Sequence, residues 1–372
     1  MGFALLVIPM YGALGLRRVD PPTNPFLMNE VQQECKCTSM ANAGKDAIVY
    51  LAKNQKSPNE AWKKGDSAFD FNHSLSLLYR NFNNCHKKDV LVFHNGDFDE
   101  EDQDRYKGLY GAQLKFHTLE KGGPYWSLPL AAGLNVSDMK NWVSGGQYSM
   151  GYRHMMRWYG ILIYKYLTDL GYDWYMRLDD DSSLLSCIDY DLFQFMRDND
   201  LAYGYRQLAF DFPRVAQPIW NMSFEYLESK SIPKTEMFMN HQKNHRWDCL
   251  APYNNFLISK LSFWTSPEVQ SWLYHVDSSG IQYTGRISDL PVQTITLEMF
   301  MPAKQVHQFT DFAYSHFTLF SSGRCMWGAL SWSAKTWADS NKRYLPRKAT
   351  YLGEHNGDIM YGCGGMALSN WP

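Results

Sequence analysis

Short apolar runs alternate with segments of helical periodicity along most of this 372-residue chain. The apolar runs, bounded by Gly, Asn, Asp or Lys, predict strands at Ala47–Ala52, Val90–Phe93, Leu114–Phe116, Tyr172–Leu178, Ala202–Tyr205, Tyr253–Ser259 and Phe309–Tyr314. Apolar residues three or four positions apart predict helices at Ser67–Phe82, Tyr152–Leu170, Tyr190–Asp198, Ser223–Lys230 and Pro267–Val276, with a further one capped by Ser288 or Asp289. This alternation is typical of an α/β domain with a mostly parallel central sheet flanked by helices.

The two ends of the chain lack this alternation. Residues 2–16 are apolar but interrupted by Pro9, and a membrane-spanning helix needs about 20 apolar residues, so a signal sequence and a membrane anchor both stay open. Residues 21–45 are polar and contain Pro-Pro, as a stem would. We therefore expect a signal or anchor with a stem at 1–45, a catalytic domain at 46–320, and an irregular, aromatic-rich extension packed on it at 321–372.

Three consecutive carboxylates follow one of the predicted strands. The strand Tyr172–Leu178 runs into Asp179, Asp180 and Asp181. Such a group is costly to hold together unless a cation or solvent compensates it. In parallel sheets ligands gather at the carboxyl ends of the strands. The pattern favours a divalent metal that carries nucleotide phosphates, although a solvated acidic turn would have the same sequence.

The end of the first predicted strand points to the same edge of the sheet. Lys53 follows Ala47–Ala52 directly. If that strand is parallel to Tyr172–Leu178, Lys53 and the three aspartates share this edge, where a lysine can face phosphates. A solvated surface role explains this lysine equally well.

Composition excludes some classes of function. The chain has 36 Lys and Arg against 38 Asp and Glu and no long basic block, so it lacks the phosphate-binding footprint of a nucleic-acid-binding protein. Its seven cysteines include no CxxC pair, which argues against a zinc module. Aromatic residues make up 16% of the chain, which suits a carbohydrate-handling surface as well as a large core.

Several motifs, taken in order, resemble glycosyltransferase family 15, the fungal Golgi α-1,2-mannosyltransferases. That family carries YRHMCR, then a strand ending in W-R-[IV]-E-P-D, then a Cys-Asp-Ile step and Y-D-x-F-x-x-M. This chain has YRHMMR at Tyr152–Arg157, MRLDDD at Met176–Asp181 and CIDYDLFQFM at Cys187–Met196. Further matches are WSLP at Trp126–Pro129, NF at Asn255–Phe256, DLPV at Asp289–Val292, FTD at Phe309–Asp311 and YSH at Tyr314–His316. The agreement extends over about residues 47–318 and identifies a divergent member.

The resemblance implies a GT-A-like nucleotide-sugar transferase fold that binds GDP-mannose and Mn²⁺. The metal-binding Glu of the family falls on Asp179, the acid that ends its motif on Asp181, and its metal-coordinating His on His316, with His307 as the rival. A carboxylate, an imidazole and diphosphate oxygens form a credible Mn²⁺ shell.

The resemblance also assigns residues to the two substrates. Tyr152 matches an active-site Tyr of the family, and Arg157 and Lys53 are expected to face the phosphates. Asp289 would hold an acceptor hydroxyl or the donor sugar. Trp126 and Asn255 would contact substrate, although half-buried packing is the commoner role of a loop Trp.

One position departs from the family. The family has a Glu in N-F-E-I, proposed as a nucleophile or a stabiliser beneath the anomeric carbon, and this chain has Leu257. A covalent glycosyl-enzyme at this position is excluded. The alternatives are same-face attack with the leaving phosphate as base, a substitute carboxylate such as Glu298 or Asp248, or loss of transfer activity.

We therefore expect a metal-dependent, retaining mannosyltransferase that uses GDP-mannose and a glycan or glycoprotein acceptor. It would work in the secretory pathway, in the Golgi lumen, with an N-terminal membrane anchor left open and no nucleic-acid partner. The alternatives are a transferase for another nucleotide sugar and a non-catalytic glycan- or nucleotide-binding descendant.

Overall fold

The structure is a computed structural model that describes residues 35, 45–54, 67–145, 148–243, 246–316, 319–322, 325–328, 349–355 and 358–363. Its centre is a seven-stranded sheet in the order β12-β6-β11-β4-β1-β2-β3. These strands are β1 (Asp46–Leu51), β2 (Asp89–His94), β3 (Leu114–Thr118), β4 (Trp174–Leu178), β6 (Tyr203–Tyr205), β11 (Phe256–Lys260) and β12 (Val306–Gln308). All pairs are parallel except the two made by β11, so the prediction of a mostly parallel sheet is confirmed.

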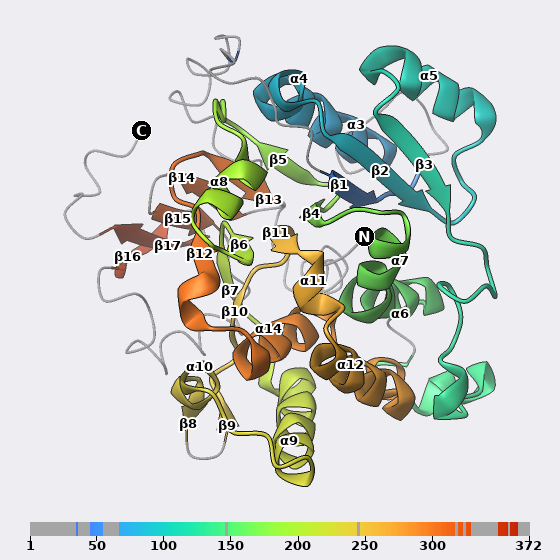
Figure 1. Cartoon of the computed structure of the whole chain (residues 1–372), viewed down its shortest axis with the longest axis vertical. Helices are drawn as coiled ribbons and strands as arrows, with labels where there is room; N and C mark the ends of the chain where they lie inside the picture. Colours follow the sequence, from blue (N-terminus) through green and yellow to red (C-terminus); the bar gives the residue numbers. More distant parts are fainter. Residues whose placement is uncertain are drawn as a thin grey trace.

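Helices cover both faces of this sheet (Figure 1). Alternate residues of β1 point to opposite faces: Ala47 and Val49 pack with α6, α7, α12 and α14, whereas Ile48 and Tyr50 pack with α3, α5 and α8. Strands buried on both sides explain the nearly continuous apolar runs in the sequence. The helices are α3 (Ser67–Leu78), α4 (Asn84–His86), α5 (Glu100–Tyr110), α6 (Met150–Arg157), α7 (Ile163–Asp169), α8 (Leu192–Asp198), α9 (Pro213–Ser229), α10 (Glu236–Asn240), α11 (Leu261–Trp264), α12 (Pro267–Ser279), α13 (Ile281–Thr284) and α14 (Asp289–Phe300).

Two of the predicted helices contain a π-helical segment. The predicted helix Tyr152–Leu170 is α6, the π-helix η4 (Trp158–Leu162) and α7 in succession. In this segment the carbonyl of Tyr159 accepts hydrogen bonds from Gln293 of α14 at 2.9 Å and from the Tyr164 hydroxyl at 3.1 Å. The second π-helix, η1 (Tyr79–Asn83), follows α3 in the same way. Shorter 3₁₀ turns are η2 (Leu130–Ala132), η3 (Val136–Asn141) and η5 (Ala303–Gln305).

A second, antiparallel sheet covers the carboxyl end of β4. Its order is β15-β14-β13-β5, formed by β5 (Ser182–Leu184), β13 (Tyr314–His316), β14 (Leu319–Ser322) and β15 (Cys325–Gly328). The predicted strand Phe309–Tyr314 is therefore wrong, because residues 309–313 form the connection between β12 in one sheet and β13 in the other. Small two-stranded sheets pair β7 (Leu208–Phe210) with β10 (Leu250–Pro252) and β8 (Gln242–Lys243) with β9 (Arg246–Trp247).

The two ends of the chain were expected to lack regular structure beyond a signal or anchor, and the C-terminal end does not fit this expectation. The tail predicted to be irregular contains β15 and the pair β16 (Ala349–His355) and β17 (Asp358–Cys363), so its regular structure was missed. The proposed signal or anchor lies outside the described residues, and no helix in the described ranges is long and apolar enough to span a bilayer. The three-part division of the chain stays a prediction.

A disulfide links Cys35, in the predicted stem, to the segment after β5. Cys35 is bonded to Cys187, which follows β5, across a sequence separation of 152 residues. Cys85 is also disulfide-bonded, and Cys249 is free and buried. Disulfides persist in oxidising compartments, so these bonds fit a chain of the secretory pathway.

Candidate active site

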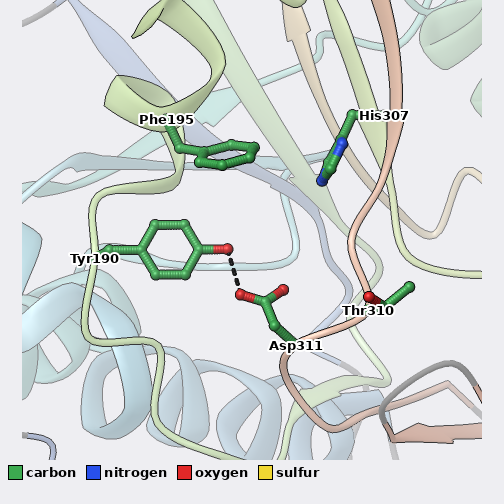
Figure 2. Close-up of a pocket in the computed structure, with 5 residues that line it drawn as sticks. All are labelled: Tyr190, Phe195, His307, Thr310 and Asp311. Carbon is green, nitrogen blue, oxygen red and sulfur yellow. Dashed lines mark hydrogen bonds between the residues drawn. The ribbon is translucent and has the colours of Figure 1, made fainter. Parts of the chain in front are cut away.

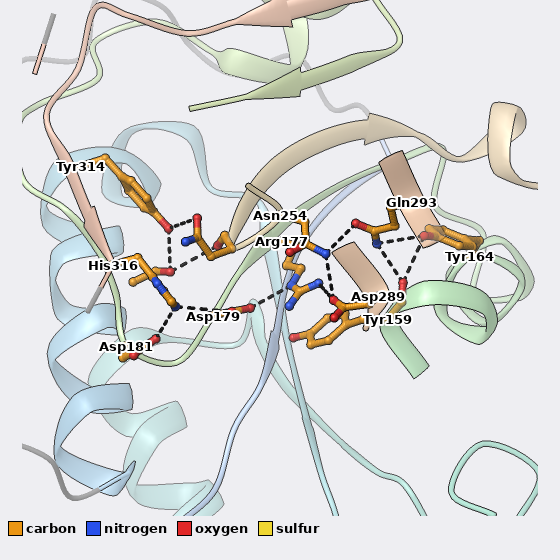
Figure 3. Close-up of polar contacts among 12 residues, drawn as sticks. Tyr159, Tyr164, Arg177, Asp179, Asp181, Asn254, Asp289, Gln293, Tyr314 and His316 are labelled. Carbon is orange, nitrogen blue, oxygen red and sulfur yellow. Dashed lines mark hydrogen bonds and ion pairs between the residues drawn. The ribbon is translucent and has the colours of Figure 1, made fainter. Parts of the chain in front are cut away.

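The aspartates that follow β4 meet a histidine from a distant strand. Asp179 is fixed by its backbone, since its N–H donates to the carbonyl of Asn255 at 3.1 Å. β13 pairs with β5 so that His316 lies opposite Ser182. His316 Nε2 is thereby 3.0 Å from Asp181 Oδ1 and 3.6 Å from Asp179 Oδ2 (Figure 3). The structure thus brings together the three predicted metal-site residues, whereas His307, the rival histidine, lies in β12.

These three side chains share one electrostatic environment. Burial by itself disfavours every charge here, but mutual pairing outweighs it. Burial opposes protonation of His316, yet Asp181 and Asp179 raise its pKa to about 10. Burial raises the pKa of the two carboxyls, but Arg177 and His316 at Asp179, and His316 at Asp181, hold each pKa below its usual range. Without a metal, His316 is an imidazolium held by two carboxylates.

The middle aspartate has the opposite character. Burial, together with the neighbouring Asp181 and Asp179, raises the pKa of Asp180 to about 6. It takes no part in the ion pairs of His316, and it was not assigned a role from the sequence.

The donor set suits a divalent metal bound with a diphosphate. Ligands in adjacent positions of an octahedral ion lie about 3 Å apart, because its bonds are about 2.1 Å long. The separations of His316 from Asp181 and Asp179 are of this size. In the described part of the chain no group of three or more His, Cys, Asp or Glu side chains is arranged to hold a metal by itself. The nucleotide and water would therefore supply most of the shell.

Arg177 links this cluster to a further carboxylate, that of Asp289. No role was predicted for this arginine. It lies within the buried strand β4, and its Nε donates to Asp179 Oδ1 at 2.8 Å while its NH1 donates to Asp289. The guanidinium also lies over the ring of Tyr159 at 3.6 Å from the centroid. The sequence did contain a signal for this role, because Arg177 is a charged residue inside an apolar strand. A charge buried in such a strand needs partners of opposite charge.

Asp289 starts α14 and belongs to a buried polar network. Besides Arg177, it accepts a hydrogen bond from Asn254 Nδ2 at 2.9 Å, and the same amide donates to Gln293 Oε1 at 2.9 Å. Gln293 in turn donates to the hydroxyl of Tyr164 at 3.0 Å. Ser288 occupies the N-cap position, but its hydroxyl donates to Asp211 instead of capping the helix. The network fixes Asp289 beside the aspartate cluster (Figure 3).

Tyr152 lies in an aromatic and cationic cluster near Asp289. Its ring stacks on Tyr148 with centroids 4.7 Å apart, and its hydroxyl accepts a hydrogen bond from Arg286 at 3.2 Å. The Arg286 guanidinium also lies 4.3 Å from the centroid of Tyr148. Burial raises the pKa of the Tyr152 hydroxyl, with Asp289 among the charges that add to this shift. Tyr152 is thus a neutral hydroxyl group on the Asp289 side of the site.

Two predicted substrate residues have other partners. Arg157 forms a bidentate ion pair with Asp277 of α12, at 2.7 and 2.8 Å, and donates to the carbonyl of Ser127 at 2.9 Å. This buried guanidinium is committed to α12 and to the Trp126 loop, which argues against a phosphate contact. Trp126 is 7% exposed and packs against His154, with ring centroids 5.5 Å apart. Packing, the alternative given for this loop Trp, is the role the structure shows.

Two further predicted residues lie at the site in different ways. Asn255 is buried, and its carbonyl accepts from the Asp179 N–H and, at 3.2 Å, from the Ser182 hydroxyl. Its Oδ1 accepts from Tyr314, so it holds the metal-site backbone in place. Lys53 follows β1 at the same edge as Asp179 and is half-buried, and its phosphate role stays a prediction.

Leu257 lies in β11 directly opposite Arg177 of β4 and is fully buried. The proposed substitutes for the missing carboxylate are elsewhere. Asp248 and Glu298 both surround His241, at 3.1 and 3.8 Å from its Nδ1. Glu298 is nine residues after Asp289 in the same helix, or about 13 Å along its axis. Neither residue therefore takes the place of the family Glu. The carboxylate nearest in the hydrogen-bond network is Asp289, because it accepts from Arg177, the residue opposite Leu257.

The chain is similar to a known protein family and to several of its members. The family model "Glycolipid 2-alpha-mannosyltransferase" matches residues 28–348. A glycolipid 2-alpha-mannosyltransferase of Saccharomyces cerevisiae is 27% identical over 239 residues, which are 60% of this chain and 52% of that protein. The alpha-1,2 mannosyltransferase KTR1 of the same yeast is 24% identical over 277 residues, which are 72% of this chain and 70% of KTR1. The chain thus spans about half the length of the first of these relatives.

Solved structures share the fold. The Mn/GDP form of core-mannan synthase A (CmsA/Ktr4) from Aspergillus fumigatus has a TM-score of 0.63 at 20% identity, covering 81% of this chain and 83% of that one. The mannosyltransferase Ktr4p from S. cerevisiae has a TM-score of 0.66 at 19% identity, covering 86% of this chain and 87% of that one. The GT-A-like α/β fold expected from the sequence is therefore confirmed. The chain belongs, as a divergent member, to the glycolipid 2-alpha-mannosyltransferase family.

Proposed function

We propose that this chain is a metal-dependent mannosyltransferase that moves mannose from GDP-mannose to a glycan or glycoprotein acceptor. The observation that carries the proposal is the meeting of Asp179, Asp181 and His316 at the carboxyl end of β4. This group of charges joins a buried histidine to two partly exposed carboxylates and is assembled from segments 137 residues apart in sequence (316 minus 179). It is well explained by a ligand that needs it. The matching family and the Mn/GDP form of a structural neighbour support the same metal and nucleotide.

The donor diphosphate would bind on the Asp179 side of Arg177. Asp179 and His316 would be the protein ligands of a Mn²⁺ ion, which when bound neutralises charge that develops on the departing diphosphate. In the metal-free protein Asp181 pairs with this same nitrogen of His316 at 3.0 Å. The shared proton would give way to a bound ion, and Asp181 would contribute a second carboxylate to the site. Lys53 is placed to offer a further positive charge to the phosphates.

The sugars would bind on the Asp289 side. Asp289 is held by Arg177 and Asn254, so its carboxylate is pre-oriented to accept from a sugar hydroxyl. The Tyr152 hydroxyl, which already accepts from Arg286, can donate its proton to another sugar oxygen. These contacts orient the two sugars.

Leu257 decides between the mechanisms for a retaining transfer. A leucine cannot form a covalent glycosyl intermediate, and Asp289 is held by two donors. We therefore infer same-face attack. The bond from the anomeric carbon to the phosphate oxygen breaks while a bond to the acceptor oxygen forms on the same face, and the leaving phosphate takes the acceptor proton.

Donor turnover by the purified chain tests the proposal. GDP release is measured from GDP-mannose, GDP-fucose, UDP-glucose and UDP-galactose, with Mn²⁺ or with a chelator. We expect turnover of GDP-mannose that disappears with the chelator and falls more than about 100-fold in Asp179→Asn. The matched control is Asp104→Asn on α5, an exposed carboxylate in an ion pair with Lys107, which should keep full activity.

Two other outcomes would correct the proposal. Turnover of a different donor would keep the reaction and change the sugar. Binding of GDP and Mn²⁺ without turnover of any donor, even with mannosyl acceptors, would favour a non-catalytic descendant, for which Leu257 is the best argument. We also propose the secretory pathway, and specifically the Golgi lumen, as the site of action, on the strength of the disulfides and of the family.

A further inference from the structure

A pocket outside the candidate active site lies where α8 meets the edge strand β12. Figure 2 shows its lining, which is formed by Tyr190, Phe195, His307, Thr310 and Asp311. Its volume is about 390 Å³, within the range of about 300–1,000 Å³ typical of small-molecule sites. None of these residues has a role in the arrangement around Asp179. We call it the Tyr190 pocket.

The aromatic part of the lining is fixed by packing. The rings of Phe195 and His307 have centroids 5.1 Å apart, and both pack on Phe309, at 5.8 and 4.8 Å. Phe309 is fully buried, and its N–H donates to the carbonyl of Tyr205 at 2.8 Å. The flat surfaces are therefore in place before any ligand arrives, which lowers the entropy cost of binding.

The polar part of the lining retains unused hydrogen-bonding groups. Tyr190 donates its hydroxyl to Asp311 Oδ2 at 2.7 Å, which orients the carboxylate (Figure 2). Among the described residues, no protein group bonds to Asp311 Oδ1, to the Thr310 hydroxyl or to either ring nitrogen of His307. Burial lowers the pKa of His307, so the neutral ring offers one donor and one acceptor.

This combination selects a class of ligand. A phosphate or another anion would be repelled by Asp311, and a purely apolar ligand would leave three polar side chains without partners. A neutral sugar ring offers an apolar C–H face to the aromatic rings and hydroxyl groups to the carboxylate, imidazole and hydroxyl. We propose that the Tyr190 pocket is a glycan-binding site that holds a neutral pyranose unit.

The pocket is within reach of the candidate active site along the chain. Asp311 precedes His316 by five residues, so the two are at most about 18 Å apart. An oligosaccharide of a few sugar units could occupy both places. A role in holding the distal end of the acceptor rests on the proposed function, whereas sugar binding by the pocket does not.

Hydroxyl-radical footprinting tests the binding directly, without turnover. The probe is a linear α-linked mannotetraose, added to the full chain in the presence of a chelator and without nucleotide. We expect oxidation of Tyr190, Phe195 and His307 to fall at least threefold at saturating probe. Mannotetraose that leaves these residues unprotected would overturn the proposal, as would protection by spermidine, a cationic probe, in place of the sugar.

Two conservative variants sharpen the test. Asp311→Asn keeps an acceptor for Tyr190 but loses the charge, and Thr310→Val keeps the side-chain shape but loses the hydroxyl. Each should weaken mannotetraose binding at least fivefold by calorimetry, whereas Asp104→Asn, the matched exposed control, should not. Unchanged affinity in both variants would contradict the proposal.

Failure of this inference is distinguishable from failure of the proposed function. If no donor is turned over but footprinting shows protection that Asp311→Asn abolishes, the glycan site stands and the transferase is refuted. If turnover occurs, Asp311→Asn should raise KM for mannotetraose and leave KM for methyl α-mannoside unchanged. An equal rise for both acceptors would show that the pocket does not hold the distal sugars.

Discussion

At the scale of single residues, Arg177 determines how the site is held together. It is the cation shared by Asp179 and Asp289, which come from the ends of β4 and α14, and its other contact is the face of Tyr159. The residue type and its buried position are visible in the sequence, but its partners are not. The carboxylates that neutralise it are two and 112 residues away, and only the fold brings them together.

Removing the charge of Arg177 should therefore be costly. In Arg177→Met the buried Asp289 and the partly exposed Asp179 lose their partner, which is expected to lower the free energy of unfolding by about 3–5 kcal/mol. Urea unfolding measures the change. Arg105→Met on α5 is the control, since its ion pair with Asp102 involves a partly exposed side chain and such pairs contribute about 0–1 kcal/mol. Equal losses in the two variants would mean that Arg177 has no special role.

The charge of His316 makes a prediction about pH. Its folded-state pKa is raised to about 10, so the stability that it contributes to the metal-free protein is complete below its unfolded pKa of about 6.5 and is lost as the pH rises through 10. His316→Asn should flatten the decline in stability over this range. Because Mn²⁺ must displace the proton, it should raise the melting temperature more at pH 8.5 than at pH 6. A pH-independent gain would contradict this assignment.

At the scale of elements, the strands were predicted more accurately than the connections between them. β1, β2, β3, β4, β6 and β11 all fall within the predicted apolar runs or extend them by one or two residues. The error at Phe309–Tyr314 arose because the apolar residues of this stretch, such as Phe309 and Phe312, are buried in the connection between β12 and β13 without forming a strand. The π-helix η4 was not predicted, and its Tyr159 carbonyl accepts from Gln293 of α14, a contact between residues 134 positions apart that the sequence does not reveal.

Close contact between η4 and α14 predicts opposite effects for two glycine substitutions. A Cβ at Gly160 would lie 3.0 Å from Gln282 Nε2 and 3.4 Å from Asp289 Cα, so Gly160→Ala should destabilise by about 1–3 kcal/mol and disturb Asp289. Gly108 in α5 has open space around it, and Gly108→Ala should stabilise by about 0.5–1 kcal/mol. Thermal unfolding of both variants decides the matter; a stabilising Gly160→Ala would refute the close contact.

At the scale of the whole molecule, the fold was predictable because its signals are repeated. Alternating strands and helices indicated the sheet, and many motifs in the same order indicated the family. The sequence predicted the place of a side chain well where the residue follows a strand end, as at Asp179, and less well where a long side chain has several possible partners. Arg157 is the example, because its ion pair with Asp277 depends on how α12 packs.

The disulfide between Cys35 and Cys187 should contribute to the stability of the whole domain. Cys187→Ser is expected to lower the free energy of unfolding by about 2–4 kcal/mol, because the reduced chain gains freedom in the unfolded state. Wild-type protein treated with a reductant should lose at least this amount, because the reductant also breaks the disulfide of Cys85. The variant should lose stability with reductant only through the bonds that it retains. Equal stability of oxidised and reduced wild-type protein would show that the bond is dispensable.

The proposed reaction depends on a metal that His316 and Asp179 bind together with the nucleotide. Pulsed electron paramagnetic resonance of the protein with Mn²⁺ and GDP tests it most directly, because an imidazole ligand gives a nitrogen coupling to the ion. We expect a coupling from one histidine nitrogen, lost in His316→Gln and retained in His307→Gln. Absence of that coupling in the wild-type protein, or its persistence in His316→Gln, would show that His316 is not a ligand of the ion.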